Sequence, residues 1–419
     1  MYQIENAGAL LRGGARRLRS VRVSRTVLFL GLTSLFTDIS AEMVATILPL
    51  YLFFTLGFTP LQFGILDGIY QGAAALVRVA SGFAGDRWRR HKEIAALGYG
   101  ISAFSKLGFL AVGGVWSALA GIVLVDRTGK GIRTAPRDAL ISLSSARADL
   151  ATAFGVHRAL DTAGAMLGPL VAFALLTLAP GAFDAIFVVS FCFAVVGLSI
   201  LLLFVQPIRA IPDAVTHEPV SVRSAVALLG DARFRTLVLV GAALGLVTLS
   251  DGFLYLGLQR RLEFEPDLLP LLFVATALVY MVLAIPMGKL ADRVGRARVF
   301  VGGYVLLLLI YASLLLPPLG TGELALYFVA FGAYYAATDG VLMAMASAVL
   351  PPELRGSGLA AVVTAITLAR LLSSVLFGAL WTAFGIDAAV LVFALGLALG
   401  LPLVALALAR SREREVAHA

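Results

Sequence analysis

Long apolar stretches separated by short polar links run through the whole chain. A helix that crosses a lipid bilayer needs about 20 mainly apolar residues, and stretches of that kind recur along all 419 residues. The pattern predicts helices at 26–54, 60–83, 94–113, 116–139, 150–178, 183–206, 234–258, 268–288, 299–317, 323–349, 357–382 and 387–409. We therefore expect an all-α membrane protein with twelve transmembrane helices.

The one long polar link, at 207–233, divides these spans into two groups of six. Short turns that contain proline and glycine separate the helices within each group. We expect five parts: a basic arm at 1–25, an N-terminal six-helix bundle at 26–206, the cytoplasmic linker at 207–233, a C-terminal six-helix bundle at 234–409 and a cytoplasmic tail at 410–419.

Lysine and arginine are distributed unevenly over the two sides of this arrangement. Basic residues gather in the cytoplasmic loops of membrane proteins. If both termini are cytoplasmic, most of the 33 lysines and arginines fall on that side, and the loops of the other side hold only Arg260 and Arg261. We expect a multi-pass protein of a bacterial cytoplasmic (inner) membrane, with its N- and C-termini in the cytoplasm.

The two halves of the chain repeat one another. The segments Gly82–Arg90 and Gly288–Arg296 match, and three pairs of charged residues recur at nearly the same separation in sequence. These pairs are Asp38 with Asp251, Asp126 with Asp339, and Arg158 with Arg370. Parallel repeats of this kind occur in secondary transporters, which bind their substrate near the bilayer midplane between the repeats. We therefore expect two pseudo-symmetric six-helix bundles.

Composition supports a membrane protein and argues against other classes. The chain is 60% hydrophobic, whereas soluble proteins are about half apolar. The net charge of +8 is explained by basic cytoplasmic loops, so we expect no nucleic-acid partner. A single cysteine, Cys192, excludes an internal disulfide and a cysteine metal cluster. Without a nucleophile–base constellation or a phosphate loop, we expect no enzyme, no cofactor and no metal, and a monomer in the bilayer.

Ionisable side chains inside the predicted spans are the first candidates for chemistry. Burial raises a carboxyl pKa and a nearby cation lowers it, so such groups can bind and release a proton near neutral pH. A fixed structural ion pair is the alternative for each of them. Asp38 and Glu42 lie one turn apart and would share a proton if both faced a cavity. The proton-coupling or cavity candidates are Asp38, Glu42, Asp126, Arg127, Lys130, Asp161, Asp251 and Asp339.

The stretch DRTGKGIRTAPRDAL, at 126–140, carries charge into an apolar run. Its spacing places Asp126, Lys130, Arg133 and Arg137 on one helical face, and such charges should face a cavity or one another. Asp126 could also form a fixed pair near Asp38 or Arg158. Pro136 should loosen the helix near its cytoplasmic end.

A second set of polar positions is a candidate for substrate binding. Arg158 and Arg370 occupy matching positions and could clamp an anionic substrate, or could instead neutralise Asp161 and Asp339. Spacings of four and seven place three further polar residues along the span at 60–83. The substrate-binding candidates are Arg158, Arg370, Asp67, Gln71 and Arg78.

Three short motifs point to a known family. Gly82-xxx-Asp86-Arg87-xx-Arg90, repeated at Gly288–Arg296, resembles motif A of the major facilitator superfamily. Arg127-Thr-Gly-Lys130-Gly131 resembles its Arg-xx-Gln-Gly signature in the fourth span. Gly155, Gly164, Gly168 and Pro169 follow the spacing of motif C, found in its drug:proton antiporters, although Ala172-Phe173 replaces the final glycine pair. The resemblance covers nearly the whole chain.

The resemblance implies a rocker-switch carrier in which the first, fourth, seventh and tenth spans line the cavity. In the family, the span-four arginine is linked to proton coupling, which carries over to Arg127. The motif A residues are implied to lie in cytoplasmic loops and to hold one closed conformation: Gly82, Asp86, Arg87, Arg90, Gly288, Asp292, Arg293 and Arg296. For Gly155, Gly164, Gly168 and Pro169 we favour close helix packing.

These features predict a secondary active transporter that works by alternating access. We expect proton-coupled efflux of a small organic molecule, with that molecule, protons and the lipid bilayer as partners. An importer or exchanger of an anionic solute is the main alternative, favoured by Arg158, Arg370 and the basic stripe at 126–137. A membrane sensor derived from a transporter is a weaker alternative, because no link is long enough for a soluble output domain.

Overall fold

The computed structural model describes residues 24–88, 90–145, 149–207, 228–317, 322–351 and 354–418, and within these ranges the chain forms helices and turns without strands. The predicted basic arm and most of the predicted linker lie outside the described residues. The last helix continues to His418, so the expected tail at 410–419 is largely an extension of that helix.

The first bundle contains six membrane-length helices. They are α1 (Arg25–Leu50), which continues as a π-helical turn (Tyr51–Thr55), α2 (Pro60–Trp88), α3 (His91–Ala111), α4 (Trp116–Leu143), α5 (Leu150–Leu178) and α6 (Phe183–Phe204). In this bundle α1 packs on both α5 and α6, while α4 packs on α2 and α3. Pro136, which was predicted to loosen the helix, is buried within α4, and the helix continues past it to Leu143.

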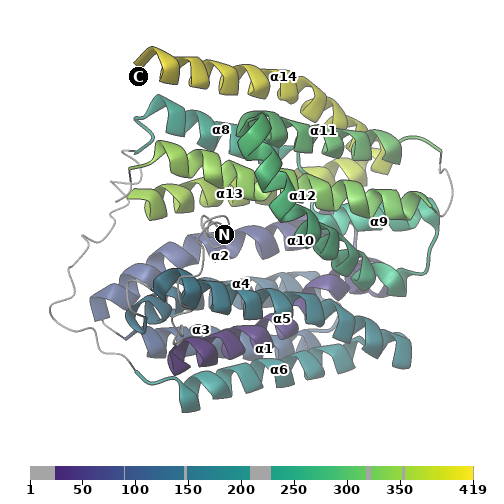
Figure 1. The fold of residues 1–419 in the computed structure, drawn as a ribbon. Helices are drawn as coiled ribbons and strands as arrows, with labels where there is room; N and C mark the ends of the chain where they lie inside the picture. The colour runs from purple at the N-terminus through teal and green to yellow at the C-terminus, as the bar shows by residue number, and fades with distance from the viewer. Residues whose placement is uncertain are drawn as a thin grey trace.

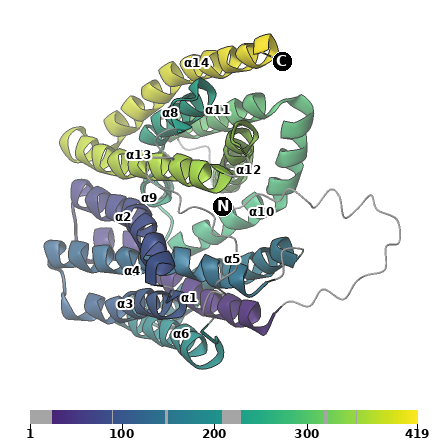
Figure 2. The ribbon, with the colours of Figure 1, turned by 90° about the vertical axis from the view of Figure 1, so that its left-hand side faces the viewer.

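The second bundle follows the same plan with one broken span. It consists of α8 (Ala232–Leu246), α9 (Asp251–Leu262), α10 (Leu269–Val294), α11 (Arg296–Leu314), α12 (Glu323–Val349), α13 (Arg355–Phe384) and α14 (Ile386–His418). Figure 1 shows the two bundles as separate layers, with α1–α6 below and α8–α14 above. The same separation is seen from the end of the molecule in Figure 2.

The helices have the length and composition of membrane spans. Within the described residues, ten segments are long and apolar enough to cross a bilayer, and one of them combines α8 and α9. The helices α2 and α4 are equally long but more polar. With those two, the chain has the twelve predicted passes, arranged as two six-helix bundles of a multi-pass membrane protein.

The seventh span is not the continuous helix predicted at 234–258. It stops at Leu246 and restarts at Asp251, where the Ser250 hydroxyl accepts a hydrogen bond from the Phe253 amide at 3.4 Å. Backbone groups freed by the break find side-chain partners: Leu249 N donates to the Tyr311 hydroxyl at 2.7 Å, and Ser373 donates to the Thr248 carbonyl at 2.7 Å. A break inside a membrane is tolerated because protein groups replace the lost hydrogen bonds.

The two bundles meet near the end of the molecule that carries the turns at 56–59 and 263–265, which we call the distal end. There α2 packs along α13, and Leu61 N donates a hydrogen bond to the Thr382 hydroxyl at 2.9 Å. Gly64 and Gly378 have no side chain, which lets the two helix backbones touch. Across the same seam, the ring of Phe63 packs edge-on against Phe253, with centroids 4.8 Å apart.

The α5 glycines confirm part of the predicted helix packing. A methyl group added at Gly168 would lie 2.8 Å from the Glu42 Cβ, and one at Gly164 would collide with the Leu35 backbone, so α5 approaches α1 closely at both. Pro169 is buried within α5. The prediction is wrong for Gly155, which is exposed and has open space beside it.

Motif A lies at helix ends rather than in loops. Gly82, Asp86 and Arg87 belong to the last turns of α2, and Gly288, Asp292 and Arg293 to the last turns of α10. Gly295, with φ of 112°, separates α10 from α11, a conformation that favours glycine. Arg296, at the start of α11, donates to Asp292 at 3.1 Å and to the Ala344 carbonyl at 3.1 Å, tying α10 and α11 to α12. Arg90 is exposed just before α3.

Candidate functional site

A pocket of about 230 Å³ lies between the two bundles. Its walls come from α1 and α2 of the first bundle and from α9, α10, α12 and α13 of the second. The lining residues are Glu42, Ala45, Leu48, Pro49, Phe63, Asp67, Tyr70, Gln71, Asp251, Gly252, Phe273, Tyr335 and Arg370. Three carboxylates and one guanidinium share this space, so its formal charge is negative. The aromatic contact of Phe63 with Phe253 closes the pocket toward the distal end.

Two of the pocket carboxylates are held in place by neutral donors. Asp67 accepts hydrogen bonds from Gln71 at 2.9 Å and from the hydroxyl of Ser374 on α13. Asp251 accepts one from the hydroxyl of Tyr335 on α12. Asp251 also lies in the first turn of α9, where the helix dipole favours negative charge. These contacts fix each carboxylate without neutralising it, which leaves both able to interact with a ligand.

Other pocket groups have unused hydrogen-bonding capacity. Within the described residues, the Nε of Arg370 and the hydroxyl of Tyr70 are buried without a hydrogen-bond partner. The Glu42 carboxylate likewise makes no hydrogen bond or ion pair to a described residue, although Glu42 lines the pocket. Buried polar groups are normally satisfied. The unused groups of Arg370, Tyr70 and Glu42 therefore indicate a site that binds polar ligands or water.

Asp126 does not face this pocket. It turns toward α3, where it accepts hydrogen bonds from Ser102 at 2.9 Å, Ser105 at 3.1 Å and Lys106 at 2.7 Å. Its other oxygen binds the guanidinium of the adjacent Arg127. Lys106, Asp126 and Arg127 are at most 3% exposed. The structure thus favours the alternative in which Asp126 belongs to a fixed ion cluster. Its partners in that cluster are Lys106 and Arg127, and neither Asp38 nor Arg158 takes part.

The ion cluster supports one wall of the pocket through Tyr70. The Arg127 guanidinium lies over the Tyr70 ring, 3.7 Å from its centroid, and Tyr70 lines the pocket. A cation on an aromatic face is attractive, more so when both are buried. Arg127 therefore positions a pocket residue, while its own charge is balanced by Asp126.

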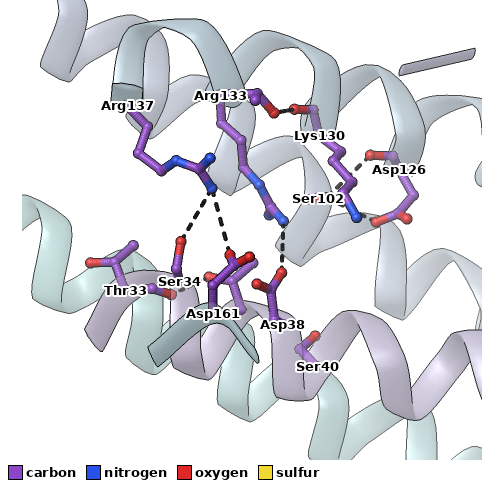
Figure 3. A network of polar contacts seen from close by, with 12 residues as sticks. Thr33, Ser34, Asp38, Ser40, Ser102, Asp126, Lys130, Arg133, Arg137 and Asp161 are labelled. Carbon is purple, nitrogen blue, oxygen red and sulfur yellow. Dashed lines mark hydrogen bonds and ion pairs between the residues drawn. The ribbon is translucent and has the colours of Figure 1, made fainter. Parts of the chain in front are cut away.

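A second ionic network joins α4 to α1 and α5, as Figure 3 shows. Arg133 Nη2 lies 3.6 Å from Asp38 Oδ1, and its guanidinium stacks over the Tyr99 ring at 4.6 Å. Arg137 lies 3.8 Å from Asp161 and donates to Ser34 at 3.3 Å. The charged face predicted for α4 is thus divided. Asp126 faces α3, whereas Arg133 and Arg137 face α1 and α5.

Two more candidates, Arg78 and Lys130, lie near the edges of this network, together with other polar groups. Ser34 also hydrogen-bonds to His157 Nε2 at 3.0 Å. Arg137 donates to its neighbour Asp138 at 2.9 Å, and Arg78 of α2 lies 3.8 Å from the same carboxylate. Arg78 therefore belongs to this network and not to the pocket that Asp67 and Gln71 line. The Lys130 side chain makes no hydrogen bond or ion pair to a described residue, and its carbonyl accepts a hydrogen bond from Thr134 at 2.6 Å.

Several predicted pairs are not brought together. Arg370 lines the pocket, whereas the Arg158 side chain is 60% exposed and lies 3.3 Å from Asp161, so the two do not form a clamp. Asp38 and Glu42 take different directions, because Asp38 faces Arg133 while Glu42 lines the pocket. The alternative in which Arg158 neutralises Asp161 agrees with the structure. Asp339 lies on α12 outside the pocket lining and makes no ion pair with a described residue.

Some functional residues escaped the sequence reasoning. Lys106, the single charged residue of the predicted span at 94–113, was not a candidate, and it is buried against Asp126. Tyr70, Ser374 and Phe63 line or support the pocket without a distinguishing pattern in sequence. The break before Asp251 had a local signal, since Ser250-Asp251-Gly252 resembles a helix N-cap within an apolar run.

Comparisons with known proteins agree on the family. A sequence model of the Major Facilitator Superfamily matches residues 30–268 and 247–419. An uncharacterized MFS-type transporter of Methanocaldococcus jannaschii is 29% identical over 365 residues, which cover 86% of this chain and 89% of that protein. An uncharacterized protein of Mycobacterium tuberculosis is 33% identical over 176 residues, or 42% of each chain.

Solved structures show the same fold. A crystal structure of the nucleoside transporter NupG, in a variant form, superposes with a TM-score of 0.75 at 18% identity, covering 92% of this chain and 99% of that one. The peptide transporter POT, also as a variant, gives a TM-score of 0.73 at 13% identity, covering 92% and 94%. With two six-helix bundles around a polar pocket and a family match along nearly its whole length, this chain belongs to the Major Facilitator Superfamily of membrane transporters and is not an enzyme.

Proposed function

We propose that the protein is a proton-coupled secondary transporter that exports a small polar organic molecule. The proposed substrate is either uncharged or positively charged. The observation that carries this proposal is the pocket between the bundles, where Glu42, Asp67 and Asp251 outnumber Arg370. Carboxylates attract cations and accept hydrogen bonds from hydroxyl and amine groups. Phe63 and Phe273 add apolar surface, as is usual in sites for small organic ligands.

Alternating access follows from where the bundles touch. The close contacts of Gly64 and Gly378, and the edge-on contact of Phe63 with Phe253, lie at the distal end, so the pocket is closed on that side. Rocking of one bundle against the other would open it there, as in other transporters built from repeats. Because both termini are predicted to be cytoplasmic, the closed distal end faces away from the cytoplasm in the proposed orientation.

Ligand screening by thermal unfolding tests the substrate class. A bound ligand stabilises the folded protein by about 2.7 kcal/mol when its concentration is 100 times its Kd. We expect putrescine, as a cation, or uridine, as an uncharged molecule with several hydroxyl groups, to raise the unfolding temperature of the purified protein. Succinate, as an anion, should leave that temperature unchanged. Asp251→Asn should remove the shift. Stabilisation by succinate alone would contradict the proposed charge of the substrate.

A second candidate function, import or exchange of an anionic solute, is favoured by one observation. Arg370 lines the pocket with a buried Nε that has no partner among the described residues. An arginine in that state can bind a carboxylate through two parallel hydrogen bonds. If the succinate shift appears and Arg370→Gln abolishes it, this second function replaces the first.

A further inference from the structure

Two hydrogen bonds between described residues cross from the first bundle to the second, and both join α2 to α13. At the distal end, Leu61 N donates to the Thr382 hydroxyl at 2.9 Å. Further toward the pocket, the Ser374 hydroxyl donates to Oδ2 of Asp67. The second bond joins two side chains, and its acceptor is a carboxylate that lines the pocket. Asp67 therefore belongs both to the pocket and to the seam between the bundles.

The backbone on either side of Asp67 is in tight contact with α13. A methyl group added at Gly64 would collide with the Ser374 carbonyl, and one at Gly68 would lie 2.9 Å from the Leu371 carbonyl. Ser374 is 1% exposed, so its hydroxyl is shielded from solvent while the seam is closed. The bond between Asp67 and Ser374 therefore exists only while α2 and α13 are packed together, and separation of the two helices must break it.

A ligand in the pocket would compete with Ser374 for the same carboxylate. Oδ2 of Asp67 accepts hydrogen bonds from Gln71 and Ser374, which are both neutral donors. An amine cation binds a carboxylate more strongly than a neutral hydroxyl does, because opposite charges attract. When α13 moves away, the Ser374 hydroxyl can donate to the Arg370 carbonyl one turn earlier, as serines within helices do. Separation of the helices thus leaves neither Asp67 nor Ser374 without a partner.

We propose that Asp67 connects substrate binding to the opening of the distal end. Its bond with Ser374 holds α2 against α13, and a cationic or hydroxyl group of the substrate that binds Asp67 takes the place of Ser374 and releases the seam. The ligand favours the open arrangement because only there does it bind Asp67 without competition. Ser374 is a positioning residue, since it acts through Asp67 and does not line the pocket. This inference rests on the proposed function, because it states how the proposed substrate changes the conformation.

Cysteine labelling from the distal side tests the Ser374 bond without a ligand. The full-length protein carries Ala45→Cys, at a position that lines the pocket, in a Cys192→Ser background, and is treated with a membrane-impermeant maleimide. Adding Ser374→Ala should make labelling about tenfold faster, because it removes a hydrogen bond to a charged group that exists only in the closed seam. In an Asp67→Ala background, Ser374→Ala should make no further difference.

Ser373→Ala is the matched control for this labelling. It removes an equally buried hydroxyl from the neighbouring position, but the partner of Ser373 is the Thr248 carbonyl of the same bundle. Labelling should therefore proceed at the rate of the parent protein.

Ligand affinity tests the competition for Asp67. Isothermal titration calorimetry should show that Ser374→Ala binds putrescine about tenfold more tightly than the wild type, because coupling between ligand binding and the seam is reciprocal. A bond with a merely structural role would leave the Kd unchanged or raise it.

Equal labelling of Ser374→Ala and its parent would overturn the proposal, as would unchanged or weaker putrescine binding by Ser374→Ala. Failure of both putrescine and uridine to bind the wild type would instead contradict the proposed substrate class. The labelling rates contain no ligand, so they still decide whether the bond between Asp67 and Ser374 holds the distal end closed.

Discussion

At the scale of single residues, neighbouring ionic groups of α4 have different tasks. Asp126 is enclosed by hydrogen-bond and ion-pair partners, namely Ser102, Ser105, Lys106 and Arg127. Arg133 lies about two turns further along α4 and faces Asp38 of α1. A carboxylate bound by two buried cations holds its charge tightly. We therefore assign Asp126 to stability.

Asp126→Asn should lower the free energy of unfolding by about 3–5 kcal/mol, because it leaves Lys106 and Arg127 buried without a counter-charge. The measurement is thermal unfolding of the detergent-purified protein. Asp292→Asn is the matched control, since its side chain is 65% exposed, and its effect should stay within about 0.5 kcal/mol. A fully stable Asp126→Asn protein that has lost proton-driven transport would show that the carboxylate acts in coupling instead.

The sequence showed that Asp126 is a charged residue within an apolar run, but it did not show which helix the carboxylate faces. Helical spacing places Asp126 with Lys130 and Arg133, yet the partner that decides its role, Lys106, comes from another span. The same limit applies to Arg158 and Arg370, whose matching repeat positions suggested a clamp. Repeat symmetry relates positions in the two bundles, and it does not require the side chains to meet.

At the scale of helices, the seam between α2 and α13 determines which side of the pocket is closed. Gly64 and Gly378 let the helix backbones touch, and Ser374 of α13 donates a hydrogen bond to Asp67 of α2. Such a seam has no room for side chains, so it is sensitive to added volume. Few hydrogen bonds join α2 and α13, so the two helices can separate and pack together again.

Gly378→Val should open the distal end, because its new methyl groups would collide with the Pro60 carbonyl. Overpacking of this kind costs about 1–3 kcal/mol, so we expect roughly tenfold faster labelling of a pocket cysteine from the distal side. The measurement uses a membrane-impermeant maleimide on Gln71→Cys in a Cys192→Ser background. Gly302→Val, at a position with open space beside it, is the control and should label at the original rate. Equal labelling of the two glycine variants would contradict the assignment of the seam.

The helices themselves were predictable, because each needs only a long apolar stretch. The twelve passes occur near their predicted positions, including α2 and α4, which are too polar for an apolar-window criterion. The break before Asp251 was missed, since the average hydropathy of a stretch does not reveal that the Tyr311 hydroxyl accepts from the Leu249 amide and that Ser373 donates to the Thr248 carbonyl.

At the scale of the whole molecule, α1 connects the pocket to the ionic network of α4 and α5. Glu42 belongs to the pocket and Asp38 to the network, and they lie one turn apart on the same helix. Coupling of two binding events requires that each favours a different arrangement of the same element. In the proposed mechanism α1 is that element, and rocking of the bundles changes access to the pocket.

Proton-driven accumulation in liposomes tests this account most directly. The wild-type protein is reconstituted into vesicles with an acidic lumen, and uptake of the radiolabelled probe that stabilises it best is compared with uptake into protein-free vesicles. We predict accumulation above the external concentration, abolished by a protonophore and by Asp38→Asn or Asp161→Asn. Uptake that only equilibrates, whatever the pH gradient, or that accumulates only when the lumen is alkaline, would contradict proton-coupled export.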